Sequence, residues 1–221
     1  MRRTSTPQEE AYVGLKFIQR EGRDACAPLV IFVHGRAGTR QVMWFFEQCL
    51  PNGASIVAFE AFLPDPLGGF SWWDFETPES KKDQIARAAK QLSLAIERFI
   101  TLGSLTPSKV IALGFSQGAV LLSSAMLSGD IALDGLGVLA GLVPKPDGPT
   151  YIHDKPQIFI AHGIKDEVIQ VERARLGVEL LRELGLHVTY IEEGVGHKVG
   201  IEGTRGLKHW VFELLGESNH Q

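Results

Sequence analysis

A ten-residue stretch near the middle of the chain constrains the fold more than any other feature. Residues 109–118 read KVIALGFSQG, in which a short apolar run is followed by a serine in the pattern Gly-X-Ser-X-Gly. A serine on so sharp a strand-to-helix turn needs small neighbours two positions before and after it, because a Cβ there would collide across the turn. Gly114 and Gly118 meet that requirement. We therefore predict a nucleophile elbow that presents Ser116.

The sequence on either side of the Gly-X-Ser-X-Gly pattern supports this interpretation more strongly than the pattern itself does. Glycine accounts for 24 of the 221 residues, so flanking glycines alone are moderate evidence. An elbow also requires a strand before the serine and a helix after it. Residues 119–127 are apolar around the whole circumference of a helix, as expected for a buried one, and Gly129 suits its C-terminus.

Short apolar runs alternate with helical patterns along the chain, which is typical of an α/β fold with a parallel sheet. We predict a mostly parallel sheet of about seven strands flanked by helices on both faces. The predicted strands are 29–33, 55–59, 110–114, 136–142, 157–161 and 187–192, with an edge strand at 12–19. Besides the helix after the elbow, helices are predicted at 42–49, 79–102 (with a cap from Ser80 and Asp83), 171–184 and 204–215.

Length and composition indicate an ordinary globular protein. We predict one domain over residues 1–221, with disorder at 1–10 and 217–221. A net charge of -4 argues against a nucleic-acid partner. No apolar run approaches the ~18 residues of a membrane span, so we expect no integral membrane association and a cytoplasmic location. An assembly of identical chains is compatible with the sequence.

No cofactor or metal is predicted. The two cysteines, Cys26 and Cys49, lack the spacing of a disulfide framework or a zinc site. Residues 135–140 (GLGVLA) match the letters of a dinucleotide fingerprint, but their glycines lie within a predicted strand and prolines follow instead of a helix. A phosphate would then have no helix N-terminus to bind, and we reject a nucleotide site.

A serine hydroxyl is a weak nucleophile at neutral pH and needs a base, which in turn needs a carboxylate to fix its tautomer. When the nucleophile lies on an elbow of this kind, the acid and then the histidine follow on loops after later strands. Asp166 follows the predicted strand 157–161, and His197 follows the predicted strand 187–192. We predict Asp166 and His197 as the acid and the base that serve Ser116.

Other candidates fit less well. His162 lies near the site, but a histidine before a glycine in a turn more often supports the loop by hydrogen bonding. Four others lie within elements, before them or in the tail: His153, His187, His209 and His220. Asp154 precedes its strand, and Glu192 and Glu193 are close in sequence to His197, so Asp166 remains the leading acid.

An acyl-transfer site also needs N–H donors for the negative charge that develops on the carbonyl oxygen. The elbow supplies the backbone N–H of Gln117. The second donor is expected from the loop after strand 29–33, which reads His34-Gly35-Arg36-Ala37-Gly38, and we choose the N–H of Arg36. Viewed alone, this loop is equally consistent with a plain glycine-rich turn.

Together these segments resemble the phospholipase and carboxylesterase family of small α/β hydrolases, which includes acyl-protein thioesterases. The resemblance extends over residues 29–215 and rests on His-Gly at 34–35, Gly-Phe-Ser-Gln-Gly at 114–118, His-Gly-X-X-Asp at 162–166 and Gly-His at 196–197. It implies the same triad and the same oxyanion donors. The thioesterase branch usually has Gly-Asp where this chain has Ala37-Gly38, so the loop looks more like that of bacterial carboxylesterases.

An aromatic and proline-rich segment, residues 62–75, separates the second predicted strand from the long helix. At the edge of the sheet such a segment either forms an apolar pocket wall over the serine or simply packs. We name Trp72, Trp73 and Phe70 as candidate substrate contacts. The chain has no sequence for a large separate lid, which favours short or medium acyl groups.

The sequence therefore predicts a metal-free serine carboxylesterase that acts on small acyl esters through an acyl-enzyme. An acyl thioesterase or lysophospholipase with the same triad is the nearest enzymatic alternative. From another class of function, a catalytically silent binding protein of hydrolase fold stays open, although Ser116, Asp166 and His197 are all intact.

Overall fold

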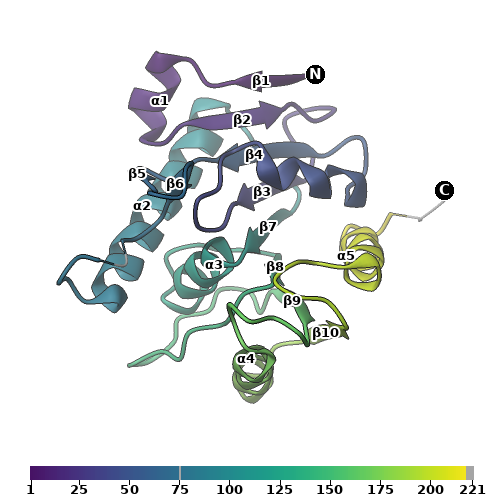
Figure 1. Ribbon diagram of the computed structural model, residues 1–221. Helices are drawn as coiled ribbons and strands as arrows, with labels where there is room; N and C mark the ends of the chain where they lie inside the picture. The colour runs from purple at the N-terminus through teal and green to yellow at the C-terminus, as the bar shows by residue number, and fades with distance from the viewer. Residues whose placement is uncertain (75, 218–221) are drawn as a thin grey trace.

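The computed structural model describes residues 1–74 and 76–217 (Figure 1). Its elements in chain order are β1 Arg2–Thr4, α1 Pro7–Val13, β2 Phe17–Arg20, β3 Leu29–Val33, the 3-10 helix η1 Val42–Cys49, β4 Ser55–Phe59, β5 Leu63–Pro64, β6 Phe70–Ser71, α2 Lys81–Leu102, β7 Val110–Phe115, α3 Gln117–Leu127, β8 Gly135–Leu139, β9 Gln157–Gly163, α4 Val171–Glu183, β10 Val188–Glu193 and α5 Ile201–Leu214. From β3 onward strands and helices alternate as predicted except at β4-β5-β6 and at β8-β9, where no helix lies between the strands.

Eight strands of the described chain form one sheet in the order β1-β2-β4-β3-β7-β8-β9-β10. From β4 to β10 the neighbouring strands are parallel, and β2 and β1 add antiparallel pairs at one edge. The predicted mostly parallel sheet is confirmed, with one strand more than the seven expected. The short strands β5 and β6 pair with each other in a separate two-stranded sheet.

Alternate side chains of each central strand enter two separate hydrophobic cores, because successive residues of a strand point to opposite faces of the sheet. In β3, Leu29, Ile31 and Val33 pack with α2, α3 and α4 on one face. Val30 and Phe32 pack with η1 and α5 on the other face. Figure 1 shows α5 on the side of the sheet opposite α2 and α3. The prediction of helices on both faces is confirmed.

The first ten residues differ from the prediction of disorder. Arg2–Thr4 pairs with β2, and Pro7–Val13 forms α1 instead of leading into the predicted edge strand at 12–19. Thr6 and Glu9 form a reciprocal capping box, and Pro7 starts the first turn, both of which favour a helix. The edge strand starts only at Phe17, because Gly14 ends α1 in a left-handed conformation with φ of 87°.

Smaller differences concern the ends of elements. Helix α2 begins at Lys81, and the Ser80 side chain does not cap it; the predicted cap with Asp83 is wrong. Strand β8 ends at Leu139 rather than at 142, because the chain turns at Ala140 with φ of 44°. The glycines of the rejected nucleotide motif lie inside β8, as predicted. Of the predicted disordered tail, residues 218–221 lie outside the described residues.

The carboxyl ends of the parallel strands meet at one edge of the sheet. The registers pair Val33 with Gly114 and Glu193 with Gly163, so the loops after β3, β7, β9 and β10 leave the sheet side by side. These loops carry all the residues predicted for the triad and the oxyanion donors. Within the described residues, none of the helices combines the length and hydropathy required to span a bilayer.

Candidate active site

The elbow between β7 and α3 holds Ser116 in a strained backbone conformation, with φ of 49° and ψ of -112°. A Cβ on Gly114 would lie 2.6 Å from the N atom of Ala119, and one on Gly118 would collide with the carbonyl oxygen of Val33. Only glycine fits at either position, as the sequence pattern implies. Strain of this kind persists where the surrounding structure holds it in place, and here it fixes the direction of the serine side chain.

Three side chains from three loops form a continuous hydrogen-bonded chain. His197 Nε2 lies 2.9 Å from Ser116 Oγ, and His197 Nδ1 lies 2.7 Å from Asp166 Oδ2. Ser116 is 9% exposed, and the Asp166 side chain is fully buried. With the proton on Nδ1 facing the carboxylate, Nε2 is an acceptor for the serine hydroxyl. The structure thus brings the three predicted triad residues within hydrogen-bond distance.

Asp166 is held as a carboxylate by the turn that carries it. Its Oδ1 accepts the backbone N–H groups of Val168 and Ile169, both at 2.9 Å. Burial raises the pKa of Asp166, but the hydrogen bonds from Ile169, His197 and Val168 outweigh it, so the pKa lies below its usual value. The ionised form is therefore the one that faces His197.

His162 supports this turn, as the sequence favoured, and does not contact the serine. Its Nε2 lies 2.7 Å from the carbonyl oxygen of Ile169, which requires the proton on Nε2. The same nitrogen lies 3.3 Å from Asp166 Oδ2. His162 is 2% exposed, so it contributes a buried support behind the acid.

The loop after β3 lies directly against the elbow. A Cβ on Gly35 would lie 3.2 Å from the Cβ of Ser116. His34 holds the loop from inside: its Nε2 accepts the N–H of Ala61 at 3.0 Å, so its Nδ1 carries the proton and donates to the carbonyl oxygen of Gly35 at 2.7 Å. Burial lowers the pKa of His34 to about 4, which keeps the ring neutral.

Charged and hydroxyl side chains fix the outer part of the same loop. The Arg36 side chain donates to Asp65 at 2.9 Å, and the Ala37 N–H donates to Ser71 Oγ at 3.2 Å. Hydrogen bonds from Ser71, the Leu67 N–H and Arg36 lower the pKa of Asp65 to about 2. The loop is therefore tied to the segment that follows β4, for which the sequence left pocket wall and packing open and indicated no contact with this loop.

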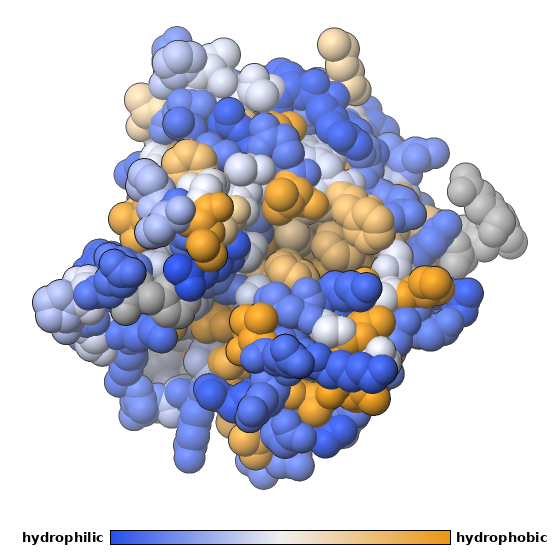
Figure 2. All heavy atoms as spheres, in the orientation of Figure 1, coloured by the Kyte–Doolittle hydropathy of each residue, from blue (hydrophilic) through white to orange (hydrophobic). Residues whose placement is uncertain are grey.

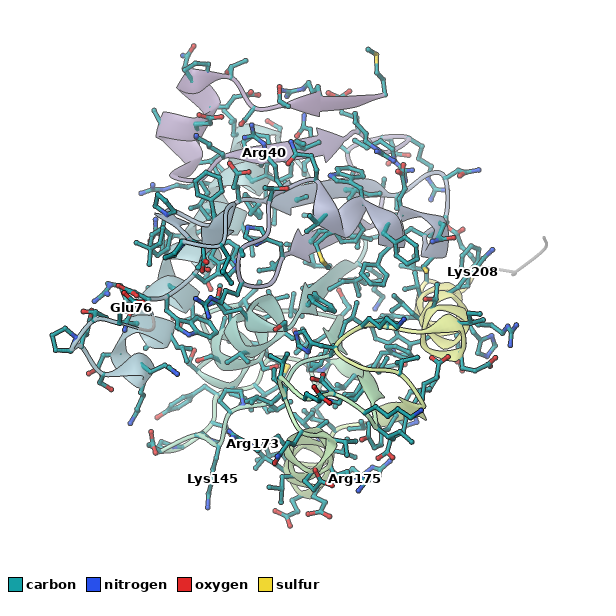
Figure 3. The ribbon with its side chains drawn as sticks, in the orientation of Figure 1. Arg40, Glu76, Lys145, Arg173, Arg175 and Lys208 are labelled. Carbon is teal, nitrogen blue, oxygen red and sulfur yellow. The ribbon has the colours of Figure 1, made fainter. Side chains whose placement is uncertain are left out.

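Arg40 anchors the far end of this loop (Figure 3). Its guanidinium lies 3.6 Å from Glu10 of α1 and 3.9 Å from Glu60, which follows β4, and its side chain is 18% exposed. These two ion pairs join the loop to α1 and to the end of β4. The sequence contained no signal for these contacts, because their partners lie 20 and 30 positions away along the chain.

Gln117 contributes to the site in two ways. As the first residue of α3 it has a backbone N–H with no carbonyl partner inside the helix. Its side chain accepts the N–H of Trp72 at 2.9 Å and donates to the carbonyl oxygen of Trp73 at 3.3 Å. The side-chain role was missed by sequence reasoning, which used only the backbone of Gln117.

The aromatic candidates for substrate contact pack instead. Trp72 is 1% exposed, and its indole N–H donates to the carbonyl oxygen of His34 at 2.9 Å. Trp73 is 5% exposed, and both indoles belong to the core that includes α2 and α3. Phe70 lies on β6, half-buried against the same core. Of the two interpretations of the segment, packing fits these residues; position 75 lies outside the described residues.

Within the described residues, no group of three or more His, Cys, Asp or Glu side chains is arranged to hold a metal ion. The loops at this edge of the sheet bring together a serine, a histidine, a carboxylate and backbone N–H groups. This combination is suited to acyl transfer through a covalent serine intermediate.

Comparison with known proteins agrees with this geometry. Residues 16–211 match the Phospholipase/Carboxylesterase family. An acyl-protein thioesterase 1 from Neurospora crassa is 30% identical over 219 residues, which cover 84% of this chain and 86% of that protein. A probable carboxylesterase from Oryza sativa subsp. japonica is 26% identical over 193 residues, covering 82% of this chain and 70% of that protein.

Solved structures show the same fold. The carboxylesterase of Bacillus cereus superimposes with a TM-score of 0.84 at 17% identity, covering 94% of this chain and 98% of that one. Because the family match spans most of the chain and the sheet, elbow and loops have the expected arrangement, the chain belongs to the phospholipase/carboxylesterase family of α/β hydrolases.

Proposed function

We propose that this protein is a serine carboxylesterase that hydrolyses short- to medium-chain acyl esters. The observation that supports this most is the hydrogen-bonded chain from Ser116 through His197 to the buried Asp166, at 2.9 and 2.7 Å. These distances lie within the range that proton transfer between a nucleophile and its base requires.

The proposed reaction has two halves. Ser116 Oγ attacks the carbonyl carbon while His197 Nε2 takes the hydroxyl proton, and Asp166 stabilises the imidazolium that forms. The backbone N–H groups of Arg36 and Gln117 would receive the negative charge on the carbonyl oxygen. His197 then gives its proton to the leaving oxygen, which leaves an acyl-enzyme. In the second half His197 takes a proton from a water molecule that attacks the acyl carbon, and it returns that proton to Ser116 Oγ as the carboxylic acid leaves.

An acyl thioesterase is the second candidate function. It is supported by relatives named acyl-protein thioesterase 1, one of them 30% identical to this chain. The same residues serve either substrate, because a thiolate leaves more readily than an alkoxide and needs no additional group. Turnover of butyryl-thiocholine against p-nitrophenyl butyrate separates the two preferences.

Labelling and turnover test the proposal together. The protein is expected to hydrolyse p-nitrophenyl butyrate and to react with a fluorophosphonate probe that peptide mapping locates at Ser116. Ser116→Ala should abolish both while leaving the far-UV spectrum and melting temperature unchanged, because it removes one oxygen and no core contact.

Ser124→Ala is the matched control, because Ser124 lies on α3, eight residues after Ser116, and is half-buried. It should keep full activity. A parent protein that neither turns over the ester nor takes up the probe would support the silent binding protein instead, and substantial activity in Ser116→Ala would exclude Ser116 as the nucleophile.

A further inference from the structure

A groove of about 650 Å³ lies between η1 and α5, on the face of the sheet opposite α2 and α3. Phe45, Val199 and Ile201 supply apolar lining, and Phe45 and Ile201 are 59% and 72% exposed. Figure 2 shows apolar side chains gathered around a hollow between these two elements. Large apolar side chains left exposed around a recess are typical of a binding surface.

The groove shares a wall with the candidate active site. Val195 and Lys198 line the groove, while His197, between them in the same loop, is hydrogen-bonded to Ser116. The same loop therefore borders both the groove and the candidate active site. Neither the sequence pattern nor the family match assigns a role to this recess.

The direction of the reaction determines which half of a substrate would lie there. In the proposed mechanism His197 delivers a proton to the leaving oxygen, so the leaving group must lie on the side of His197. The carbonyl oxygen lies on the other side, toward the N–H groups of Arg36 and Gln117. A recess next to the His197 loop therefore suits the leaving alcohol rather than the acyl chain.

The charges around the groove are mainly positive. Lys198 and Lys208 line it, and the ion pairs found in this part of the described chain involve Arg175, His197, Arg205 and His209 but neither lysine. Figure 3 places Lys208 on the part of α5 that faces the end of η1. Arg205 also lines the groove but is paired with Glu202 at 2.7 Å.

The one carboxylate that lines the groove is held by the start of α5. Glu193 accepts the N–H of Gly203 at 3.3 Å, in the first turn of that helix, where backbone N–H groups favour negative charge. Its charge is therefore partly offset, whereas Lys198 and Lys208 keep a net positive charge in a protein whose overall charge is -4.

We propose that this groove binds the leaving-group half of the substrate and selects an apolar alcohol that carries an anionic substituent, such as a sulfonate or carboxylate. The apolar part would cover Phe45 and Ile201, and the anion would lie near Lys198 and Lys208. This inference rests on the proposed esterase function and specifies the substrate class of that same site.

Two esters with the same acyl group test the inference: 2-naphthyl butyrate and 6-sulfonato-2-naphthyl butyrate. The parent protein is expected to prefer the sulfonated ester in kcat/KM by about fivefold, mainly through a lower KM, which is the size of effect that exposed charge pairs produce. The preference should shrink as salt rises from 20 to 500 mM, because salt screens exposed charges. The double variant Lys198→Gln, Lys208→Gln should bring the ratio of the two esters close to one.

Two controls separate the groove from general charge effects. Lys155→Gln removes a charge just before β9, at the opposite edge of the sheet, and should leave the ratio as in the parent. Ile201→Glu places a carboxylate in the groove and should invert the preference. Leu176→Glu adds the same charge to α4, where Leu176 is 61% exposed, and should not.

The two proposals fail in different ways. If the parent hydrolyses 2-naphthyl butyrate but shows no preference for the sulfonated ester, the groove assignment is overturned and the esterase function stands. The same holds if the preference survives both lysine substitutions. If neither ester is hydrolysed, the esterase function itself is wrong, and the groove assignment falls with it.

Discussion

Asp166→Asn is the most informative single substitution, because the structure determines how the new amide must orient. The Asp166 carboxylate accepts three N–H groups: those of Val168 and Ile169 at Oδ1, and that of His197 at Oδ2. Asparagine keeps one oxygen and replaces the other by an NH2 group, which can only donate. The N–H groups on one side of residue 166 must therefore lose the oxygen that accepts their hydrogen bonds.

The oxygen of the new amide is expected to face the backbone N–H groups of Val168 and Ile169. The N–H groups of Val168 and Ile169 are fixed in the turn at 2.9 Å and cannot stop donating. His197 can respond by changing tautomer, so that its Nδ1 accepts from the amide and its Nε2 carries the proton. That proton would face Ser116 Oγ, and the ring could no longer take the hydroxyl proton. We expect kcat to fall by about 10⁴-fold, equivalent to ~5 kcal/mol of transition-state stabilisation.

Steady-state turnover of p-nitrophenyl butyrate measures the effect, with Glu167→Gln as the matched control. Glu167 is the exposed neighbour of Asp166, and its substitution should leave kcat within about twofold of the parent. An Asp166→Asn protein that is folded and retains more than a tenth of the parent kcat would refute the tautomer argument and the assignment of Asp166 as the acid.

Three further outcomes are expected. His197→Ala should lower kcat by on the order of 10⁴-fold, whereas His162→Ala, which loses the hydrogen bond to the Ile169 carbonyl oxygen and one long contact to the acid, should cost about tenfold; the reverse ranking in the same ester assay would move the base to His162. Dialysis against EDTA should leave turnover unchanged, and activity restored by added zinc would contradict this. Because burial lowers the pKa of His34 to about 4 while an unfolded histidine titrates near 6.5, the unfolded chain binds the proton first as the pH falls. The free energy of unfolding should therefore drop by up to ~3 kcal/mol between pH 6.5 and 4, and urea denaturation of His34→Gln should show a smaller drop if the ring is responsible.

The central strands, and the positions of the three side chains proposed as a triad, could be predicted because their signals are local. Strands 29–33 and 55–59 match the structure at both ends, since strands covered on both faces are continuously apolar and bounded by polar turns. Ser116, Asp166 and His197 could be placed because each follows a recognisable strand, and parallel strands end at one edge of the sheet. Their meeting is a consequence of topology rather than of any single motif.

The supporting contacts could not be predicted, because both partners are ordinary residues far apart in the chain. Nothing in the sequence around Asp65 indicates that its carboxylate accepts from Arg36, 29 positions earlier. The burial of Trp72 could not be predicted either, because the sequence of a loop does not show whether an aromatic side chain packs in the core or contacts a ligand. At the N-terminus the sequence does contain a helix signal, the capping box of Thr6 and Glu9, which the predicted edge strand at 12–19 left out of account.

The buried contacts around Trp72 give the aromatic segment a different role from the one first assigned to it. Gln117, the residue after the proposed nucleophile, accepts the N–H of Trp72 with its side chain, and the Trp72 indole donates to the carbonyl oxygen of His34. His34 in turn accepts the N–H of Ala61. The two stretches of backbone proposed to receive the oxyanion, one before α3 and one after β3, are thus joined through a buried tryptophan. Donors held in this way need no rearrangement when charge develops, which is the condition for effective electrostatic stabilisation. Because this framework is buried, we expect substrate selection to come from side chains outside it, as proposed for the exposed apolar and basic residues between η1 and α5.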